Sequence, residues 1–361
     1  MDHTSNWEKI KENTEKAAIP QEDDSIILFG AGRLALVAAP LLKGRLHIAA
    51  LCDNDPEKQG RKIEGLPCIS PDQISQYPQP FVLISSNLYL KNIHSQLESM
   101  GIRHIGLDTY VMRTHWEEFE MVYQMLDEES KDVYAGVLWC RLTGDAEESE
   151  KYCCGDQYFS LPKFKYLYRP NEVFVDCGAY VGDTVEKVVE YSSGLVRRIY
   201  AFEPCDRAFM ALKKRAALLK DLWAMEDDRI ICEKKGVGRQ AATMAFHANP
   251  DVLTAGTFSD STQSDSRAVE IVSLDQYFAD TDAERITFIK ADIEGFEWDM
   301  LHGAAKTIQR DKPKLAICIY HSIFDFFRIA AYLKELVPEY RFHVRYHGGI
   351  NFCEVVLYCH L

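Results

Sequence analysis

The sequence has no apolar run long enough to span a bilayer, and its first residues, MDHTSNWEKIKENTEK, contain no apolar signal-peptide core. We therefore expect a cytoplasmic protein without a membrane span. Positive charge is also scarce, because 41 lysines and arginines face 55 aspartates and glutamates, which gives a net charge of −14. Such a field repels phosphate backbones, so we expect no nucleic-acid partner.

None of the 11 cysteines belongs to a C-x-x-C pair, which argues against a zinc or redox motif. Several of them lie in or beside predicted strands, where a reduced cysteine acts as a small apolar residue. Internal repeats and low-complexity segments are absent as well. What remains is a chain of 361 residues with 47% hydrophobic content, long enough for two domains with their own cores.

The stretch EVFVDCGAYVGDT, from Glu172 to Thr184, predicts a buried strand, a glycine turn and the start of a helix. The strand ends on Asp176, and Gly178 and Gly182 form the turn. Glycines let the backbone approach a ligand closely, and the free N–H groups of a helix start favour an anion. The turn suits a ligand with a carboxylate or phosphate, as in dinucleotide-binding and S-adenosylmethionine-binding folds.

Two later segments distinguish between a dinucleotide-binding and an S-adenosylmethionine-binding fold. RIYAFEP predicts a second strand that ends on Glu203, where an acid accepts hydrogen bonds from ribose hydroxyls. ITFIKADIEGFEWDML predicts a further strand followed by Asp292, Glu294 and Glu297. An acidic rim of this kind suits a cationic sulfonium better than a pyrophosphate.

The segments FVDCGAYVGDT, YAFEP, VSLDQYF, IKADIEGFEWDMLHGA and EVVLY resemble the FkbM family of S-adenosylmethionine-dependent methyltransferases. The resemblance covers roughly Glu172 to the C-terminus and implies a class I methyltransferase fold with a C-terminal β-hairpin. It also implies O-methyl transfer to a hydroxyl-bearing acceptor such as a carbohydrate or glycan precursor. The expected cofactor-binding residues are Asp176, Gly178, Tyr180, Gly182, Asp183, Thr184, Glu203, Pro204, Gly236, Val237 and Asp292.

Methyl transfer to a hydroxyl requires a group that takes the proton. His321 follows a predicted strand and is our candidate general base, although a structural histidine is the competing interpretation. Asp292 and Glu294 complete the catalytic set, and Glu294 shares a face with Asp292 only if the strand continues that far. These three side chains offer metal ligands, but no compact spacing motif supports a metal and we expect none.

A second glycine turn precedes the first. SIILFGAGRLALVAAPLL places Gly30, Gly32 and Ala35 in a G-x-G-x-x-A pattern, and the next predicted strand ends on Asp53. The region resembles the small Rossmann-like domains of sugar-modifying enzymes. With Arg33, these residues predict a site for a nucleotide, nucleotide-sugar or NAD(P); a docking or dimerisation platform, and hence a homodimer, is the alternative.

The expected fold class is α/β, with two doubly wound Rossmann-like domains joined by a helical connector. We expect a helix and linker over residues 1–24, the first domain over 25–110, the connector and a loop over 111–171, and the methyltransferase domain over 172–361. The connector should form two helices that meet near residues 127–130. Two other functions stay open: a sensor or scaffold that binds ligands without turnover, and an NAD(P)-linked oxidoreductase.

Overall fold

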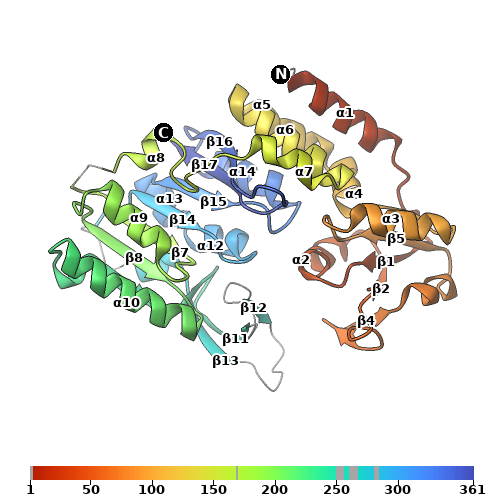
Figure 1. The fold of residues 1–361 in the computed structure, drawn as a ribbon, viewed down its shortest axis with the longest axis horizontal. Helices are drawn as coiled ribbons and strands as arrows, with labels where there is room; N and C mark the ends of the chain where they lie inside the picture. The colour runs from red at the N-terminus through yellow and green to blue at the C-terminus, as the bar shows by residue number, and fades with distance from the viewer. Residues whose placement is uncertain (1–2, 168–169, 249–255, 260–266, 280–283) are drawn as a thin grey trace. The chain divides into compact units, whose positions relative to one another are not determined.

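The computed structural model describes residues 3–167, 170–248, 256–259, 267–279 and 284–361 (Figure 1). The chain divides into two compact units. The first comprises Met1–Cys154, Ile319–Arg328 and Val344–Val355, and the second comprises Gly155–Cys318, Ile329–His343 and Val356–Leu361. The chain thus passes between the units repeatedly.

The first unit contains a six-stranded sheet in the order β3-β4-β2-β1-β5-β6. Its strands are β1 (Ser25–Phe29), β2 (Ile48–Cys52), β3 (Lys62–Ile63), β4 (Leu66–Ile69), β5 (Pro80–Ile84) and β6 (Arg103–Gly106). All pairings are parallel except the one between β3 and β4. Every residue of β1 is buried, as expected for a strand with both faces covered. The crossover helices are α2 (Arg33–Leu42) and α3 (Leu90–Ser99), and η1 (Pro71–Gln76) is a 3-10 helix.

The first unit also contains a group of helices. They are α1 (His3–Lys16), α4 (Leu107–Thr114), α5 (Trp116–Met125), α6 (Glu128–Thr143), α7 (Ala146–Ser149) and the 3-10 helix η2 (Glu150–Tyr152). The two connector helices expected from the sequence are confirmed as α5 and α6. Asp127 caps α6, because its Oδ1 accepts a hydrogen bond from the Ser130 amide at 2.8 Å. Trp7 of α1 stacks on Tyr123 of α5 with ring centroids 4.2 Å apart.

The second unit is built around a seven-stranded sheet in the order β16-β17-β15-β14-β7-β8-β9. The strands are β7 (Val173–Cys177), β8 (Arg198–Phe202), β9 (Ile230–Glu233), β14 (Phe288–Ala291), β15 (Lys314–Cys318), β16 (Arg341–Tyr346) and β17 (Val355–His360). β17 runs antiparallel to β15, while β14, β7, β8 and β9 pair in parallel. The α/β class and the terminal strand pair expected from the sequence are therefore confirmed.

Several helices accompany this sheet. They are α8 (Pro162–Lys165), α9 (Asp183–Tyr191), α10 (Asp206–Leu222), η3 (Asp227–Arg229), α11 (Leu274–Tyr277), α12 (Glu297–Gly303), α13 (Ala305–Asp311) and α14 (Asp325–Leu336). Three elements, α14, β16 and β17, have residues in both units.

A separate four-stranded sheet has no counterpart among the elements expected from the sequence. Its order is β10-β13-β11-β12. The strands are β10 (Gly236–Val237), β11 (Ala242–Ala248), β12 (Gly256–Ser259) and β13 (Arg267–Val272). Gly236 and Val237, expected among the cofactor-binding residues, belong to this sheet, where they pair in parallel with Ile271 and Val272.

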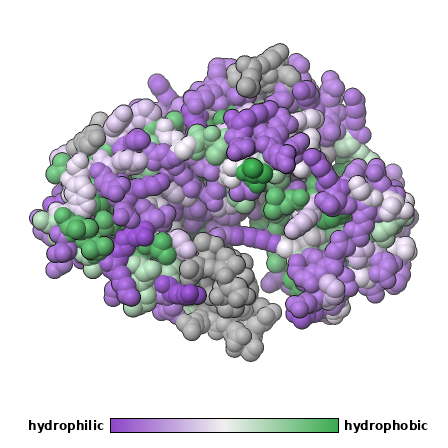
Figure 2. Space-filling view, viewed as in Figure 1, coloured by the Kyte–Doolittle hydropathy of each residue, from purple (hydrophilic) through white to green (hydrophobic). Residues whose placement is uncertain are grey.

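Three further features concern the lengths of the helices, the cysteines and the exposed apolar side chains. Among the described residues, no helix combines the length and the apolar character that crossing a membrane requires. All 11 cysteines are free thiols. Figure 2 shows apolar residues gathered over the end of α10, where Leu218, Leu222 and Trp223 are exposed.

Candidate active site

Three strand ends of the second unit come together at one edge of the sheet. In the register of the sheet, Cys177 of β7 pairs with Phe202 of β8 on one side and with Ala291 of β14 on the other. The next residues along these strands are Gly178, Glu203 and Asp292. Because parallel strands end at the same edge, three of the residues singled out in the sequence are brought together.

The glycine turn after β7 has an unusual backbone. Gly178, Tyr180 and Gly182 have φ angles of +86°, +47° and +84°. A Cβ on Gly178 would lie 1.9 Å from the carbonyl oxygen of Asp292, so no side chain fits there. Tyr180 adopts the same left-handed region without being glycine, which costs about 1–2 kcal/mol. The surrounding structure must hold this conformation, as it does at many ligand-binding turns.

Glu203 supplies part of that restraint. Its Oε2 accepts a hydrogen bond from the Tyr180 amide at 2.9 Å, and its Oε1 accepts one from the Cys205 amide at 2.8 Å. Burial raises the pKa of Glu203 to about 7, although these two amides act in the opposite direction. Near neutral pH, the surroundings of Glu203 therefore compensate the negative charge of its carboxylate only in part.

A buried ion pair lies beneath the turn. Lys290 of β14 lies 3.0 Å from Asp176 of β7, and its Nζ donates a hydrogen bond to the Gly178 carbonyl at 2.7 Å. Burial disfavours the charge of Lys290, but Asp176 and Asp292 outweigh burial and hold the pKa of Lys290 above its ordinary value. Asp176 has no exposed surface, and its contact with a cofactor stays a prediction.

Asp292 is held by an aromatic residue from outside the sheet. The Tyr158 hydroxyl donates a hydrogen bond to Asp292 Oδ2 at 2.8 Å, and the Tyr158 amide donates one to the Tyr358 hydroxyl at 3.0 Å. Lys290 Nζ lies 5.0 Å from the centroid of the Tyr158 ring. The sequence-predicted set of site residues contains neither Tyr158 nor Lys290. A lysine inside the apolar run ITFIKADI is the signal for the second, since a buried charge requires a partner.

The same-face arrangement expected for Asp292 and Glu294 is wrong. β14 ends at Ala291, and Glu294 and Gly295 have φ angles of +60° and +93°. The backbone turns there, so the alternation of a strand no longer applies. Glu297 is fully buried, and its Oε1 accepts a hydrogen bond from the Ile293 amide at 2.8 Å, which closes this turn.

The remaining predicted residues occupy defined places. Asp183 and Thr184 open α9, whose N-cap is Gly182, with no side-chain capping bond. Pro204 lies between the two residues of the Glu203–Cys205 contact. His321 is buried in the first unit, with its ring centroid 4.0 Å from that of Tyr320. Its role as a general base stays a prediction.

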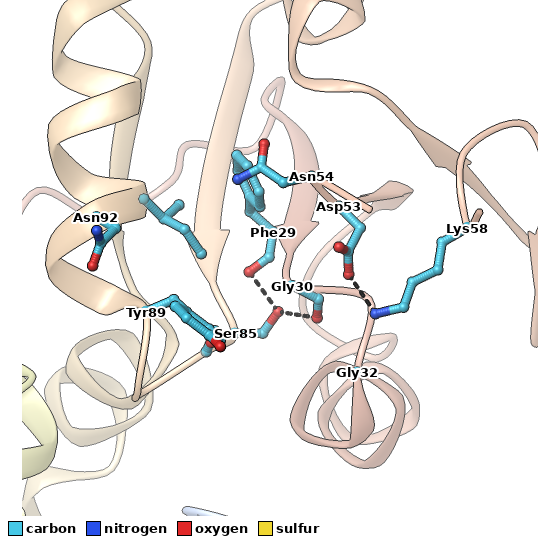
Figure 3. A pocket seen from close by; sticks show the side chains of 11 residues that line it. Phe29, Gly30, Gly32, Asp53, Asn54, Lys58, Ser85, Tyr89 and Asn92 are labelled. Atoms are coloured by element: carbon cyan, nitrogen blue, oxygen red, sulfur yellow. Dashed lines mark hydrogen bonds and ion pairs between the residues drawn. The ribbon is translucent and has the colours of Figure 1, made fainter. Parts of the chain in front are cut away.

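The second glycine turn lies in the first unit, beside a cavity of about 430 Å³. Gly30, Gly32 and Asp53 line this cavity (Figure 3), and Arg33 is the first residue of α2. Gly30, Gly32 and Asp53 are thus brought together around an open space, whereas Arg33 is not one of its lining residues.

Two segments of the chain match family models. Residues 176–343 match the methyltransferase FkbM domain, and residues 22–105 match a C2185-like N-terminal domain. The first match confirms the resemblance inferred from the motifs. No curated protein matches the chain.

Solved structures add information on the fold. The chain is similar to methyltransferase FkbM from Methylobacillus flagellatus KT, with 20% identity, a TM-score of 0.59, and coverage of 99% of this chain and 100% of that one. This likeness shows a shared fold. UDP-D-quinovosamine 4-dehydrogenase from Vibrio fischeri is 24% identical over 24% of this chain and 83% of that one, with a TM-score of 0.21. Fibrillarin from Aeropyrum pernix, in complex with natively bound S-adenosyl-L-methionine, is 11% identical over 54% of this chain and 68% of that one, with a TM-score of 0.31.

The buried ion pair generates a prediction about stability. Lys290→Met leaves the Asp176 carboxylate buried without its cation and removes the hydrogen bond to the Gly178 carbonyl. We expect the free energy of unfolding to fall by about 3–5 kcal/mol, measured by urea denaturation.

The exposed pair between Lys312 and Glu339 provides a control. Lys312→Met should change the unfolding midpoint far less, because solvent already screens that pair. Adding Asp176→Asn to Lys290→Met should recover part of the lost stability. Equal effects of the two lysine substitutions would show that the buried pair does not stabilise the second unit.

Proposed function

We propose that this chain, whose residues 176–343 form a methyltransferase FkbM domain, transfers the methyl group of S-adenosylmethionine to a hydroxyl group of its acceptor. The observation that supports this most is the alignment of Gly178, Glu203 and Asp292 on adjacent strand ends. At this edge of the sheet lie a glycine turn with no side chain in the way of a ligand, the buried carboxylate of Glu203, which we assign to the ribose, and the carboxylate of Asp292.

The residues at this edge fit the proposed donor. S-adenosylmethionine supplies an electrophilic methyl group on a cationic sulfur. Ribose hydroxyls are hydrogen-bond donors, and Glu203 is a buried carboxylate whose pKa of about 7 reflects incomplete compensation. Each carboxylate oxygen has two lone pairs, and the amides of Tyr180 and Cys205 use only one on each. Glu203 therefore has acceptor capacity left for a diol.

The amino-acid end of the donor carries both charges of a zwitterion. The glycine turn and the start of α9 provide backbone N–H groups suited to its carboxylate. Asp292 provides a negative charge suited to its ammonium group, and the hydrogen bond from Tyr158 fixes one oxygen of that carboxylate. Asp176 and Lys290 act indirectly, by fixing the carbonyl of Gly178.

The transfer step needs alignment and one proton acceptor. The acceptor oxygen forms a bond to the methyl carbon while the carbon–sulfur bond breaks, and the electron pair of that bond stays on sulfur. The hydroxyl proton passes to a base on the protein, for which we propose His321. A carbohydrate or glycan precursor is the acceptor class we propose, in line with the family resemblance.

Glu203→Gln tests the donor site. The amide keeps the size of the side chain but removes the charge and half of the acceptor capacity, so S-adenosylmethionine should bind about 1–3 kcal/mol more weakly in isothermal calorimetry. Glu190→Gln, on the exposed side of α9, is the matched control and should bind normally. Unchanged affinity in a folded Glu203→Gln variant would remove the ribose assignment.

The titration of Glu203 predicts a pH dependence. With a pKa of about 7 in the free protein, the carboxyl group is mostly protonated at pH 6 and mostly ionised at pH 8. Hydroxyl donors stabilise the ionised form, so binding releases a proton below pH 7 and weakens as the pH falls. We expect affinity for methylthioadenosine to drop about tenfold from pH 8 to pH 6.

Methylthioadenosine is the suitable probe because it has the ribose but lacks the titrating amino-acid groups of the donor. The same measurement on Glu203→Gln should show no such slope. A slope that persists in the variant would assign the titration to another group.

His321→Ala tests the base. We expect transfer of labelled methyl groups to slow by about 10²–10⁴-fold while the affinity for S-adenosylmethionine stays within twofold. The assay requires an acceptor, found by screening sugars, nucleotide-sugars and glycolipids with labelled donor. Normal turnover of the variant on such an acceptor would rule out His321 as the base.

A further inference from the structure

The cavity of the first unit lies where a doubly wound sheet holds its ligands. Its walls come from the residues that follow β1, β2 and β5, together with the first turn of α3 (Figure 3). The sheet order places β2 and β5 on opposite sides of β1, so the chain reverses direction across the sheet at this point. A volume of about 430 Å³ falls in the range of small-molecule sites.

The two glycines of the turn have different roles. Gly30 has a φ of +107°, and a Cβ there would lie 3.0 Å from the Ser85 carbonyl oxygen, so the fold itself requires glycine. Gly32 has ordinary extended angles, φ −109° and ψ −167°, and a Cβ would meet no atom within 4 Å. Neither the backbone nor the packing requires glycine at position 32. The open space next to Gly32 is the cavity.

The carboxylate of Asp53 already accepts hydrogen bonds from other groups of the protein. Its Oδ2 accepts hydrogen bonds from the Ala31 amide at 2.9 Å and from Lys58 Nζ at 2.8 Å, and its Oδ1 accepts one from the Asp55 amide at 2.9 Å. Burial alone would raise the pKa of Asp53, but Lys58 and the amides outweigh it and hold that pKa below its ordinary value. Three of the four acceptor positions are filled, which leaves too few for a ribose diol.

Lys58 adds a positive charge to the lining of the cavity. The side chain is 38% exposed, and one of its three N–H donors is used on Asp53. Asp53 and Lys58 are the charged residues of the lining, and they neutralise each other. The remaining donors of Lys58 face the same space as Gly32 and the N-terminus of α2, where an anion is favoured.

The rest of the wall suits an uncharged organic group. Ser86 and Asn92 supply neutral hydrogen-bonding groups, and Tyr89 lies at the rim with 65% of its surface exposed. The Ser85 hydroxyl donates towards the carbonyls of Phe29 and Gly30, both at 3.0 Å, which fixes the end of β1. An exposed aromatic ring beside a polar cavity is suited to stacking on a planar base.

We propose that this cavity binds a nucleoside diphosphate, free or as its sugar ester, with the diphosphate between Gly32 and Lys58. The ligand is held through its phosphates. Asp53 serves to position Lys58 and the glycine turn. A dinucleotide that needs Asp53 for its adenosine ribose is therefore disfavoured. The inference concerns the first unit and does not depend on methyl transfer.

Calorimetry on the full chain tests the ligand class, with UDP, ADP, UDP-N-acetylglucosamine, inorganic pyrophosphate and NAD⁺ as separate probes. We expect at least one nucleoside diphosphate or its sugar ester to bind at least tenfold more tightly than NAD⁺ and than pyrophosphate. Tighter binding of the sugar ester than of the free diphosphate identifies a nucleotide-sugar site, and the reverse order identifies a nucleotide site. Preferred binding of NAD⁺, or no binding by any probe, would overturn the proposal.

Substitutions then locate the site. Gly32→Val fills the cavity without straining the backbone, and Gly44→Val is its control, because a Cβ at Gly44 also meets no atom within 4 Å. Lys58→Met removes the cation, and Lys62→Met is its exposed control. We expect Gly32→Val and Lys58→Met to weaken binding at least tenfold in protein that still unfolds cooperatively on heating, and the controls to bind normally. Full binding by Gly32→Val would place the ligand elsewhere.

Discussion

The ion pair between Asp176 and Lys290 is the constraint on which the site of the second unit depends. Both side chains are inside the sheet, with 0% and 4% of their surface exposed, so neither charge has water as an alternative partner. The pair ties β7 to β14, and the bond from Lys290 to the Gly178 carbonyl extends it into the turn. The left-handed residues of the turn, and the contact that Glu203 makes with it, begin at this fixed carbonyl.

Much of this arrangement follows from local sequence. The apolar runs before Gly178, Glu203 and Asp292 end at the same sheet edge because parallel strands must do so, and the sequence order of the motifs is enough to place them. Gly30 and Gly178 were identifiable because short apolar strands lead directly into them. The Asp127 cap likewise marks the boundary between α5 and α6 without any tertiary information.

Other features depend on contacts that no local pattern encodes. The Tyr158 hydroxyl donates a hydrogen bond to Asp292, 134 positions away in the chain. The carboxylate of Asp53 accepts a hydrogen bond from Lys58, which takes an acceptor position that a ribose diol would need. The expected pairing of Glu294 with Asp292 assumed that a strand continues, whereas positive φ angles at Glu294 and Gly295 redirect it. In the four-stranded sheet, β10 consists of Gly236 and Val237 alone, which is too short a segment to show a strand period.

The repeated passage of the chain between the units has a consequence for how the protein can be divided. Helix α14 and strands β16 and β17 each contribute residues to both units, so no single cut separates one from the other. Ending the chain after the family-matched segment at residue 343 would deprive the large sheet of β17 and break β16 within its own length. Because the chain crosses between the units several times, neither unit can be produced intact from one continuous segment of this sequence.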